Sequence, residues 1–398
     1  MFGFVVAASE PGFCAIIPKI FNEKAEIYTM SDRLTDIIAH YTFGKNYRAS
    51  MYSINDLALE DSTDSRIWKR SAESSMAKPY TDLRALSRQL ASSGEQVLTY
   101  FLDGSRRIFK TGEIEYDRII YPIMAGQIYA GCCRRADRKL FPEALKHEIV
   151  VALPNKSDKD GKPGFFPGIA QKLSESPTLK RRGLEISAVL PYSSVKDSRN
   201  TSYDDKATAA IQDRMIQCEK EITGALVRKL NHRNYLIKDG SLEYRKKSQL
   251  PPANYRWVIG LSKSFSPEAC KNVRGKPDPS YIAGLPPYHR TQAACVSNPE
   301  ILGEAKFAVW YIRLHERMDS AFAGIVKAER MLVTQSEQQQ ETIDSAEIDM
   351  ISAYILNERS PVCYGNDTRW ASHIYPVYLT EKYIKSKYIS SESFLQLF

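Results

Sequence analysis

The sequence lacks the features that mark secreted, zinc-stabilised or membrane proteins. Its seven cysteines are an odd number and include no Cys-x-x-Cys pair, which disfavours both a disulfide framework and structural zinc. No basic segment precedes the first apolar run, and no apolar run reaches the length of a membrane span. We therefore expect a soluble, cytoplasmic protein with no membrane partner.

The overall composition is that of an ordinary globular protein. The 398 residues are 43% hydrophobic and 26% charged, so a large core is expected and wholesale disorder is not. The length suits one large domain with insertions or two domains. A formal net charge of +8 suits a polyanionic partner without requiring one.

The first ninety residues read as a separate block. Short strands are expected at 2–7 and 13–20, a helix at 28–41, a polar loop at 60–78 and a short helix at 83–90. We expect residues 1–90 to form an accessory, dimerisation or partner-docking α+β block. The main domain would span 91–398, with a long polar insertion at 154–204.

One tripeptide, Asp-Gly-Ser, occurs twice in the chain. Asp103-Gly104-Ser105 follows the apolar run 97–102, and Asp239-Gly240-Ser241 follows 235–237. Each copy puts a carboxylate where a strand is expected to stop and a glycine where the backbone can turn. Both could be ordinary turns, because Asp-Gly is a common turn dipeptide. Two such strand ends side by side could instead hold divalent metal.

The order of the expected elements favours the metal-site interpretation over two ordinary turns. Strands at 97–102, 118–133 and 147–153 precede a helix at about 205–230, and a fourth strand then ends at Asp239. This is the order of the ribonuclease H-like fold, an α/β mixed sheet flanked by helices. In that fold an Asp of the first strand, a carboxylate of the following helix, an Asp of the fourth strand and a later acidic or His residue surround two metal ions.

The helix offers two carboxylates for this role. Glu219 borders the apolar stripe of the helix, whereas Glu221 points further towards solvent. We therefore expect Glu219 to reach the site. The alternative is that Glu219 is an ordinary solvated residue on the flank of an amphipathic helix.

Several short motifs resemble those of the NurA nuclease family. They are Asp-Gly-Ser at 103–105, Lys-Asp-Gly-Ser-Leu at 238–242, Gly-Leu-Ser-Lys at 260–263, Val-Trp-Tyr-Ile-Arg-Leu at 309–314 and Tyr-Pro-x-x-Leu at 375–379. The resemblance runs from about residue 95 to 390. It implies a ribonuclease H-like core, a ring-shaped homodimer, and DNA degradation with two Mn²⁺ or Mg²⁺ ions per site beside a HerA-type hexameric ATPase. By position, it implies that Asp103, Glu219 and Asp239 are metal ligands and that Lys263 lies beside them.

The chain departs from the family pattern at one corner of that site. The family has a His or Asp several residues after the Tyr-Pro motif, whereas here that place holds Tyr383. His373 and Glu381 are nearby substitutes, and the sequence does not choose between them. A lone His is equally often a surface or capping residue.

Basic residues follow the expected catalytic strands. Lys263 at a strand end could hold a scissile phosphate, or it could be a solvated loop lysine. Three arginine or lysine pairs could contact nucleic acid phosphates, although each pair alone is more often a solvated surface: Arg106 and Arg107, Arg134 and Arg135, Lys246 and Lys247.

These observations lead to one hypothesis with three alternatives. We expect a metal-dependent DNA nuclease that works with a HerA-like hexameric ATPase in DNA end processing or in defence against foreign DNA. The alternatives are a non-catalytic DNA-binding or ATPase-docking subunit, another ribonuclease H-like nuclease, and a structural protein with two coincidental turns.

Overall fold

The chain divides into two compact units, Met1–Ser31 and Asp32–Phe398, and the second is described here. The computed structural model describes residues 33–47, 52–53, 67–75, 78–196, 201–242, 244, 250–266, 270–272, 274, 276–299, 303–316, 321–359 and 370–398. The strands expected at 2–7 and 13–20 lie outside the described residues.

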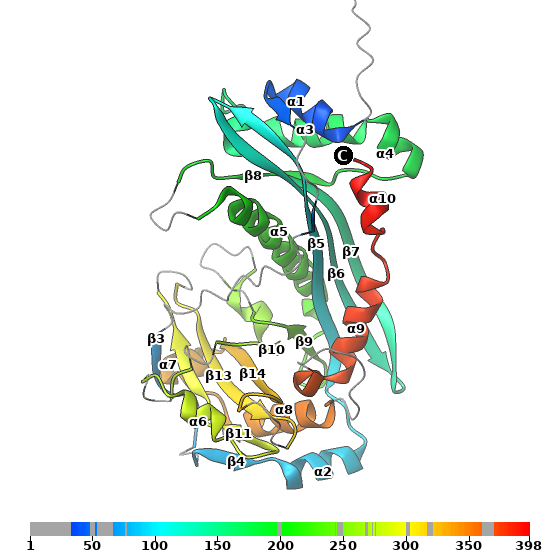
Figure 1. Ribbon diagram of the computed structural model, residues 1–398. Helices are drawn as coiled ribbons and strands as arrows, with labels where there is room; N and C mark the ends of the chain where they lie inside the picture. Colours follow the sequence, from blue (N-terminus) through cyan, green and yellow to red (C-terminus); the bar gives the residue numbers. More distant parts are fainter. Residues whose placement is uncertain are drawn as a thin grey trace, which may run out of the picture. The chain divides into compact units, whose positions relative to one another are not determined.

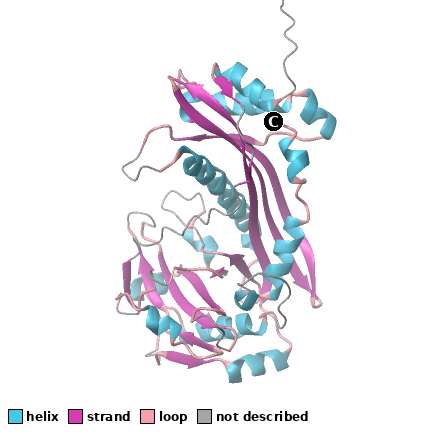
Figure 2. Cartoon of the chain, viewed as in Figure 1, coloured by secondary structure: helices cyan, strands magenta, loops and turns pink. Residues whose placement is uncertain are grey.

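Three long antiparallel strands form the centre of the sheet (Figures 1 and 2). They are β5 (Leu98–Tyr116), β6 (Ile119–Ala136) and β7 (Lys139–Pro154). The turn between β5 and β6 is Asp117-Arg118, and the turn between β6 and β7 is Asp137-Arg138. All four turn residues have positive φ, between 48° and 64°. Two positive-φ residues in a two-residue loop make a type I′ turn, whose twist matches that of the flanking strands.

Two parallel strands extend this centre. β9 (Tyr235–Asp239) pairs in parallel with β5, and β10 (Val258–Ser262) pairs in parallel with β9. The spatial order is therefore β7-β6-β5-β9-β10. This third-second-first-fourth-fifth arrangement is that of the ribonuclease H-like fold, and it confirms the predicted fold class.

Further strands continue the sheet on both sides. Beyond β10 come β14 (Ile325–Leu332), β13 (Lys306–Arg313), β12 (Ala294–Ser297) and β3 (Ile67–Ser71), and beyond β7 comes β8 (Ala188–Tyr192). The short strands β1 (Lys45–Tyr47) and β2 (Tyr52–Ser53) pair with β5, and β4 (Tyr80–Asp82) pairs with β11 (His289–Thr291). The described parts of the first ninety residues thus contribute strands to the main sheet.

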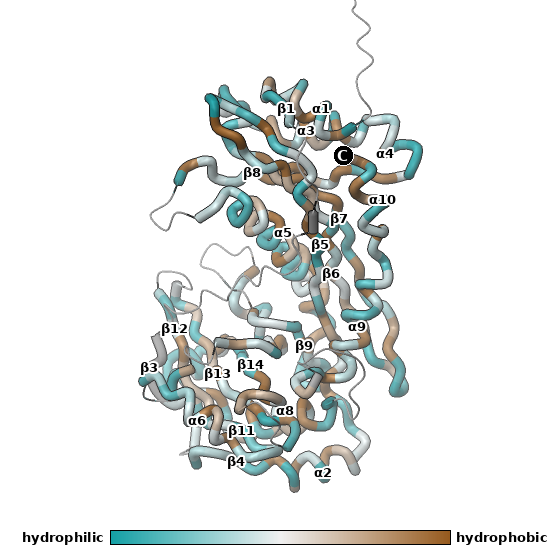
Figure 3. Tube along the Cα trace, in the orientation of Figure 1, coloured by the Kyte–Doolittle hydropathy of each residue, from teal (hydrophilic) through white to brown (hydrophobic). Residues whose placement is uncertain are grey.

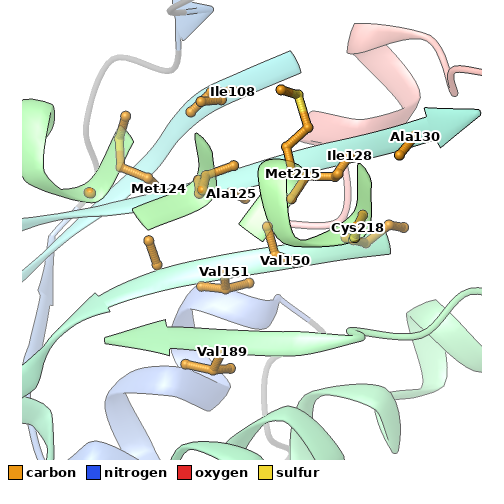
Figure 4. Close-up of a cluster of buried hydrophobic side chains, with 14 of the residues drawn as sticks. Ile108, Met124, Ala125, Ile128, Ala130, Val150, Val151, Val189, Met215 and Cys218 are labelled. Carbon is orange, nitrogen blue, oxygen red and sulfur yellow. The ribbon is translucent and has the colours of Figure 1, made fainter. Parts of the chain in front are cut away.

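Helix α5 (Tyr203–Leu226) covers one face of β5, β6 and β7 (Figure 1). It begins at the N-cap Ser202, whose hydroxyl accepts from the Asp205 amide, so Asp204 and Asp205 lie in the first turn. Polar and apolar residues share this helix (Figure 3), and its apolar side is buried. Met215 and Cys218 lie over Ile128 and Val150 of the sheet (Figure 4).

A second helical segment follows the opposite face of β5 and β6. It consists of α9 (Tyr375–Lys385) and α10 (Ser391–Leu395). The connection between them is tied to β6, because Tyr129 donates to the Lys387 carbonyl at 2.8 Å and Gln127 bonds both backbone groups of Ile389. The sheet between α5 and α9 therefore carries the residues of the candidate site.

The remaining helices surround the two ends of the sheet. They are α1 (Leu34–Thr42), α2 (Arg84–Ser93), α3 (Phe165–Ser174), α4 (Pro177–Arg182), α6 (Pro279–Ala283), α7 (Gln335–Gln340) and α8 (Ser345–Asn357). Within the described ranges, no helix is both long and apolar enough to cross a membrane.

Several local expectations were wrong. The segment 154–204, expected to be a polar loop, contains α3, α4 and β8, because Ile169, Leu173 and Leu179 bury an apolar side. Residues 335–357 form two helices and not one, since α7 ends before its C-cap Glu341, which has a positive φ, and α8 begins after a new N-cap, Asp344. The first strand does not stop at Asp103.

Candidate active site

Asp103 lies inside β5, whereas Asp239 ends β9. Leu102 is in register with Lys238 across the parallel pair, so the next residues, Asp103 and Asp239, are neighbours at the same level of the sheet. Asp103 is only 5% exposed. Burial and the negative charge of Asp239 together hold the pKa of the Asp103 carboxyl well above its usual range. After Asp239 the chain turns at Gly240, whose φ of +81° favours glycine.

The two faces of the sheet hold different parts of the site. A Cβ on Gly104 would lie 2.5 Å from Glu219 Oε1, so Gly104 faces α5. Successive residues of a strand face opposite ways, which places Asp103 on the α9 face. Its partner across the pair with β6, Gly131, agrees, because a Cβ there would lie 2.9 Å from Ile384 of α9.

On the α9 face, a buried lysine joins two carboxylates. Lys263, just after β10, lies with Nζ 2.9 Å from Asp239 Oδ2 and 3.4 Å from Glu381 Oε2. Burial alone would lower the pKa of Lys263, but Asp239, Glu381 and Asp103 raise it above its usual value. For Glu381, burial acts to raise the pKa, yet Lys263 and Lys385 bring it below its usual value.

On the α5 face, Glu219 has a lysine partner of its own. Lys238 Nζ lies 3.0 Å from Glu219 Oε2 and also donates to the carbonyls of Asp239 and Ser241. Both side chains are nearly inaccessible. Glu221 instead forms ion pairs with Lys146 and Arg214 on the more exposed side of the helix. The helical spacing in the sequence thus predicted correctly that Glu219 is the buried glutamate and Glu221 the more exposed one.

Sequence reasoning missed Lys238 as a member of the site. The available signal was its place in the apolar run Tyr-Leu-Ile-Lys, one residue before Asp239. Strand alternation puts Lys238 and Asp239 on opposite faces, so a buried Lys238 needs an acidic partner on the helix side.

The position of the fourth expected ligand, for which the sequence offered His373 or Glu381, lies at α9. Glu381 reaches Lys263, as described above. His373 is 5% exposed; its ring lies 5.7 Å from that of Tyr378, and its charge helps to lower the pKa of Glu381. Tyr383 is half-buried, with the Lys387 ammonium 5.2 Å from its ring centre.

The basic residues expected to bind nucleic acid have different surroundings. Arg134 pairs with Glu143 at 3.2 Å, and Arg135 pairs with Glu358 at 2.5 Å, so the charge of each is already compensated. Arg106 is partly buried, and burial lowers its pKa. The guanidinium of Arg107 lies over the Tyr388 ring, with 4.3 Å between Cζ and the ring centre. Lys246 and Lys247 lie outside the described residues.

The carboxylates fit a hard divalent cation by chemistry and charge. Mg²⁺ and Mn²⁺ prefer carboxylate oxygens, and on the α9 face three carboxylates, Asp103, Asp239 and Glu381, surround the buried ammonium of Lys263, while Glu381 also pairs with the more exposed Lys385. The raised pKa of Asp103 reflects its burial first and the negative charge of Asp239 second. In the part of the chain that the structure describes, however, no group of three or more His, Cys, Asp or Glu side chains is already arranged around one metal position.

Comparison with known proteins shows a structural similarity but no sequence match. No family model matches the sequence, and no curated protein matches it. Among solved structures, the crystal structure of the NurA nuclease from Sulfolobus solfataricus is similar over 79% of this chain and 90% of that chain, with 11% identity and a TM-score of 0.39. With identity and TM-score this low, the match carries no conclusion about function, and the proposal below rests on the residues of the site.

Proposed function

We propose that the protein is a metal-dependent DNA nuclease. The observation that carries the proposal is the meeting of Asp103 and Asp239 on adjacent parallel strands at the centre of a ribonuclease H-like sheet, with Lys263 and Glu381 beside them. A buried carboxylate with a raised pKa, such as Asp103, is costly to stability, and such groups are concentrated at functional sites.

Each residue has a role in this proposal. Asp103, Asp239 and Glu381 would hold Mn²⁺ or Mg²⁺ on the α9 face, with His373 as a further candidate ligand. Glu219, expected from the sequence to be a ligand, lies on the α5 face and pairs with Lys238, so it would support the site from the other side of the sheet. The bound ions would supply an activated water and stabilise charge on the leaving oxygen. Lys263 would hold the scissile phosphate and the charge that develops on it.

The test is DNA degradation by the full chain with Mn²⁺, Mg²⁺ or EDTA. Linear duplex and single-stranded DNA are the substrates, and Asp103→Asn and Asp239→Asn are the variants. Glu143→Gln is the matched control, because Glu143 is also ion-paired on the same three-stranded unit but lies outside the site. Metal-dependent cleavage that is lost in both Asp variants and kept in the control supports the proposal. Cleavage that persists in either Asp variant contradicts the assigned ligands.

A second candidate is a non-catalytic DNA-binding or ATPase-docking subunit. The observation in its favour is that Lys263 and Lys238 already pair with the carboxylates Asp239, Glu381 and Glu219. A protein of this kind would bind DNA, degrade none under any metal condition, and gain no thermal stability from Mn²⁺.

The partner and the biological role belong to the same proposal. On the sequence resemblance, the active form would be a homodimer acting with a HerA-like hexameric ATPase in DNA end processing or in defence against foreign DNA. Cleavage that appears only after such an ATPase and ATP are added would support a partner-gated nuclease. Full activity of the isolated chain, unchanged by the ATPase, would argue against that dependence.

A further inference from the structure

The solvent side of α9 carries a stripe of aromatic and basic residues, Tyr375, Tyr378, Lys382 and Lys385, called the α9 stripe below. Their spacing of three, four and three residues puts them on one side of the helix. The opposite side, which includes Val377, Thr380 and Ile384, is buried against the sheet. The stripe therefore does not contribute to packing on the sheet.

Three members of the stripe, Tyr375, Lys382 and Lys385, are exposed, and Tyr378 is half-buried. Tyr375 is 50% exposed, an unusual value for a large aromatic side chain, and the Lys385 side chain is also 50% exposed. The Lys382 ammonium lies 5.4 Å from the centre of the Tyr378 ring. The two rings lie towards the start of α9 and the two ammonium groups towards its end, so one helix side offers stacking surfaces for unpaired bases and, next to them, contacts for phosphates.

The stripe also adjoins the candidate site. Glu381, the α9 residue that reaches Lys263, precedes Lys382 and pairs with Lys385 at 2.5 Å. A strand lying along the stripe would thus pass the edge of the carboxylate cluster.

We propose that the α9 stripe binds a single DNA strand and leads it to the site, with bases stacked on Tyr375 and Tyr378 and phosphates on Lys382 and Lys385. This deepens, and rests on, the proposed nuclease function by naming the form of DNA that the site receives. Stacking requires unpaired bases, so the stripe should prefer a single strand to a duplex.

The experiment measures binding of fluorescent oligothymidine to the full chain in EDTA, as a function of salt. The variants are Tyr375→Leu/Tyr378→Leu and Lys382→Gln. The control is Lys172→Gln, because Lys172 is also an exposed lysine, 5.9 Å from the ring centre of Tyr41, but lies on α3, which packs on α1 and β8. Lys385 is left unchanged because it pairs with Glu381.

We expect the tyrosine double variant to bind at least about tenfold more weakly, the order expected for the loss of base stacking. Lys382→Gln should flatten the plot of log K against log salt concentration by about 0.7, the value for one phosphate contact with a single strand. Lys172→Gln should match the wild type. Unchanged affinity of the tyrosine variant, or equal loss in the Lys172 control, overturns the proposal.

The outcome is separable from that of the proposed function. If the wild type cleaves DNA but the tyrosine variant binds oligothymidine normally, the stripe proposal fails and the nuclease proposal stands. If binding falls as expected but the wild type cleaves nothing with any metal, the stripe proposal stands and the nuclease proposal fails. A tyrosine variant that loses duplex binding as much as oligothymidine binding also overturns the single-strand assignment.

Discussion

Lys263 lies with its ammonium 2.9 Å from the Asp239 carboxylate, in a place where both side chains are largely shielded from water. This pair compensates one of three neighbouring carboxylates on the α9 face. Removal of the ammonium would leave Asp103 and Asp239 side by side with no buried cation and Glu381 with Lys385 alone, a costly arrangement.

We therefore expect Lys263→Met to lower the free energy of unfolding at pH 7 by about 3–5 kcal/mol, the usual cost of breaking a buried ion pair from one side. The loss should shrink at pH 5, where the uncompensated carboxyls would more readily take up protons. Urea unfolding at both pH values measures the effect. Lys146→Met removes the more exposed partner of Glu221 and should cost at most about 1 kcal/mol; equal losses in the two variants would contradict the prediction.

Asp103→Asn should stabilise the fold while abolishing metal-dependent cleavage. The native pKa of Asp103 is raised, so the native state holds the proton more tightly than the unfolded chain does. Stability from this group is present below its unfolded pKa of about 4 and is lost as pH rises through the native pKa. The Asn variant carries no buried negative charge at this position, so it should melt at a higher temperature than the wild type at pH 7. The difference between the two melting temperatures should become smaller towards pH 4. A lower melting temperature at pH 7 would contradict this.

Mn²⁺ should raise the melting temperature of the wild type. A ligand at 100 times its dissociation constant stabilises the native state by about 2.7 kcal/mol. Asp239→Asn should lose most of this shift, because it removes a proposed ligand, whereas Glu143→Gln should keep it. Thermal melts with and without Mn²⁺ measure the effect. A shift of equal size in Asp239→Asn would mean that the ion binds elsewhere.

Gly104→Ala should disturb the site from the α5 face. Its Cβ would lie 2.5 Å from Glu219 Oε1, so the carboxylate would have to move away from Lys238. We expect a loss of roughly 2–4 kcal/mol in stability, the order of damage to a buried ion pair, together with reduced cleavage. Gly168→Ala in α3 is the control, because a Cβ there meets nothing within 4 Å, and Ala is the better helix former. Equal effects at the two glycines would refute the crowding argument.

Arg313→Met should be among the most damaging changes far from the site. The Arg313 side chain is fully buried and donates to the carbonyls of Leu285, Ala323, Ala283 and Ala321 at 2.6–3.1 Å. Removing the guanidinium leaves these acceptors without that donor, at a cost of about 1–3 kcal/mol for each one that stays buried and unsatisfied. Arg313→Lys keeps a donor at this position and should lose less stability than Arg313→Met. Denaturant unfolding of the two variants measures the difference in their free energies of unfolding. A neutral result for Met would show that the loops rearrange freely.

The core of the fold could be predicted because its elements follow one another in a diagnostic order. Three strands, the amphipathic α5 and a fourth strand ending at Asp239 can be recognised from periodicity alone, and the same periodicity separated Glu219 from Glu221. The two faces of the site were not predicted. They follow from the alternation of Asp103 with Gly104 and of Lys238 with Asp239, which requires knowing that β5 continues past the tripeptide.

The residues at the turns explain why the sequence did not predict that β5 continues past Asp103-Gly104-Ser105. The Asp117-Arg118 and Asp137-Arg138 turns use arginine at a positive-φ position, where Asn-Gly or Asp-Gly would be the usual signal. Asp103-Gly104 carries that usual signal but lies within a paired strand, because Gly104 is needed there to make room for Glu219. Local propensity therefore placed the turn at Asp103-Gly104, fourteen residues before its position at Asp117-Arg118.

The position of Asp103 within β5 protects its backbone from local unfolding. Hydrogen-bonded strands, β6 and β9, flank it on both sides, so its backbone is released only when the centre of the sheet comes apart. Native-state hydrogen exchange should find the amides around Asp103 among the slowest in the chain, opening with the free energy of global unfolding. A carboxylate on a loop can be displaced by local fraying, whereas Asp103 should stay in place for as long as the protein stays folded.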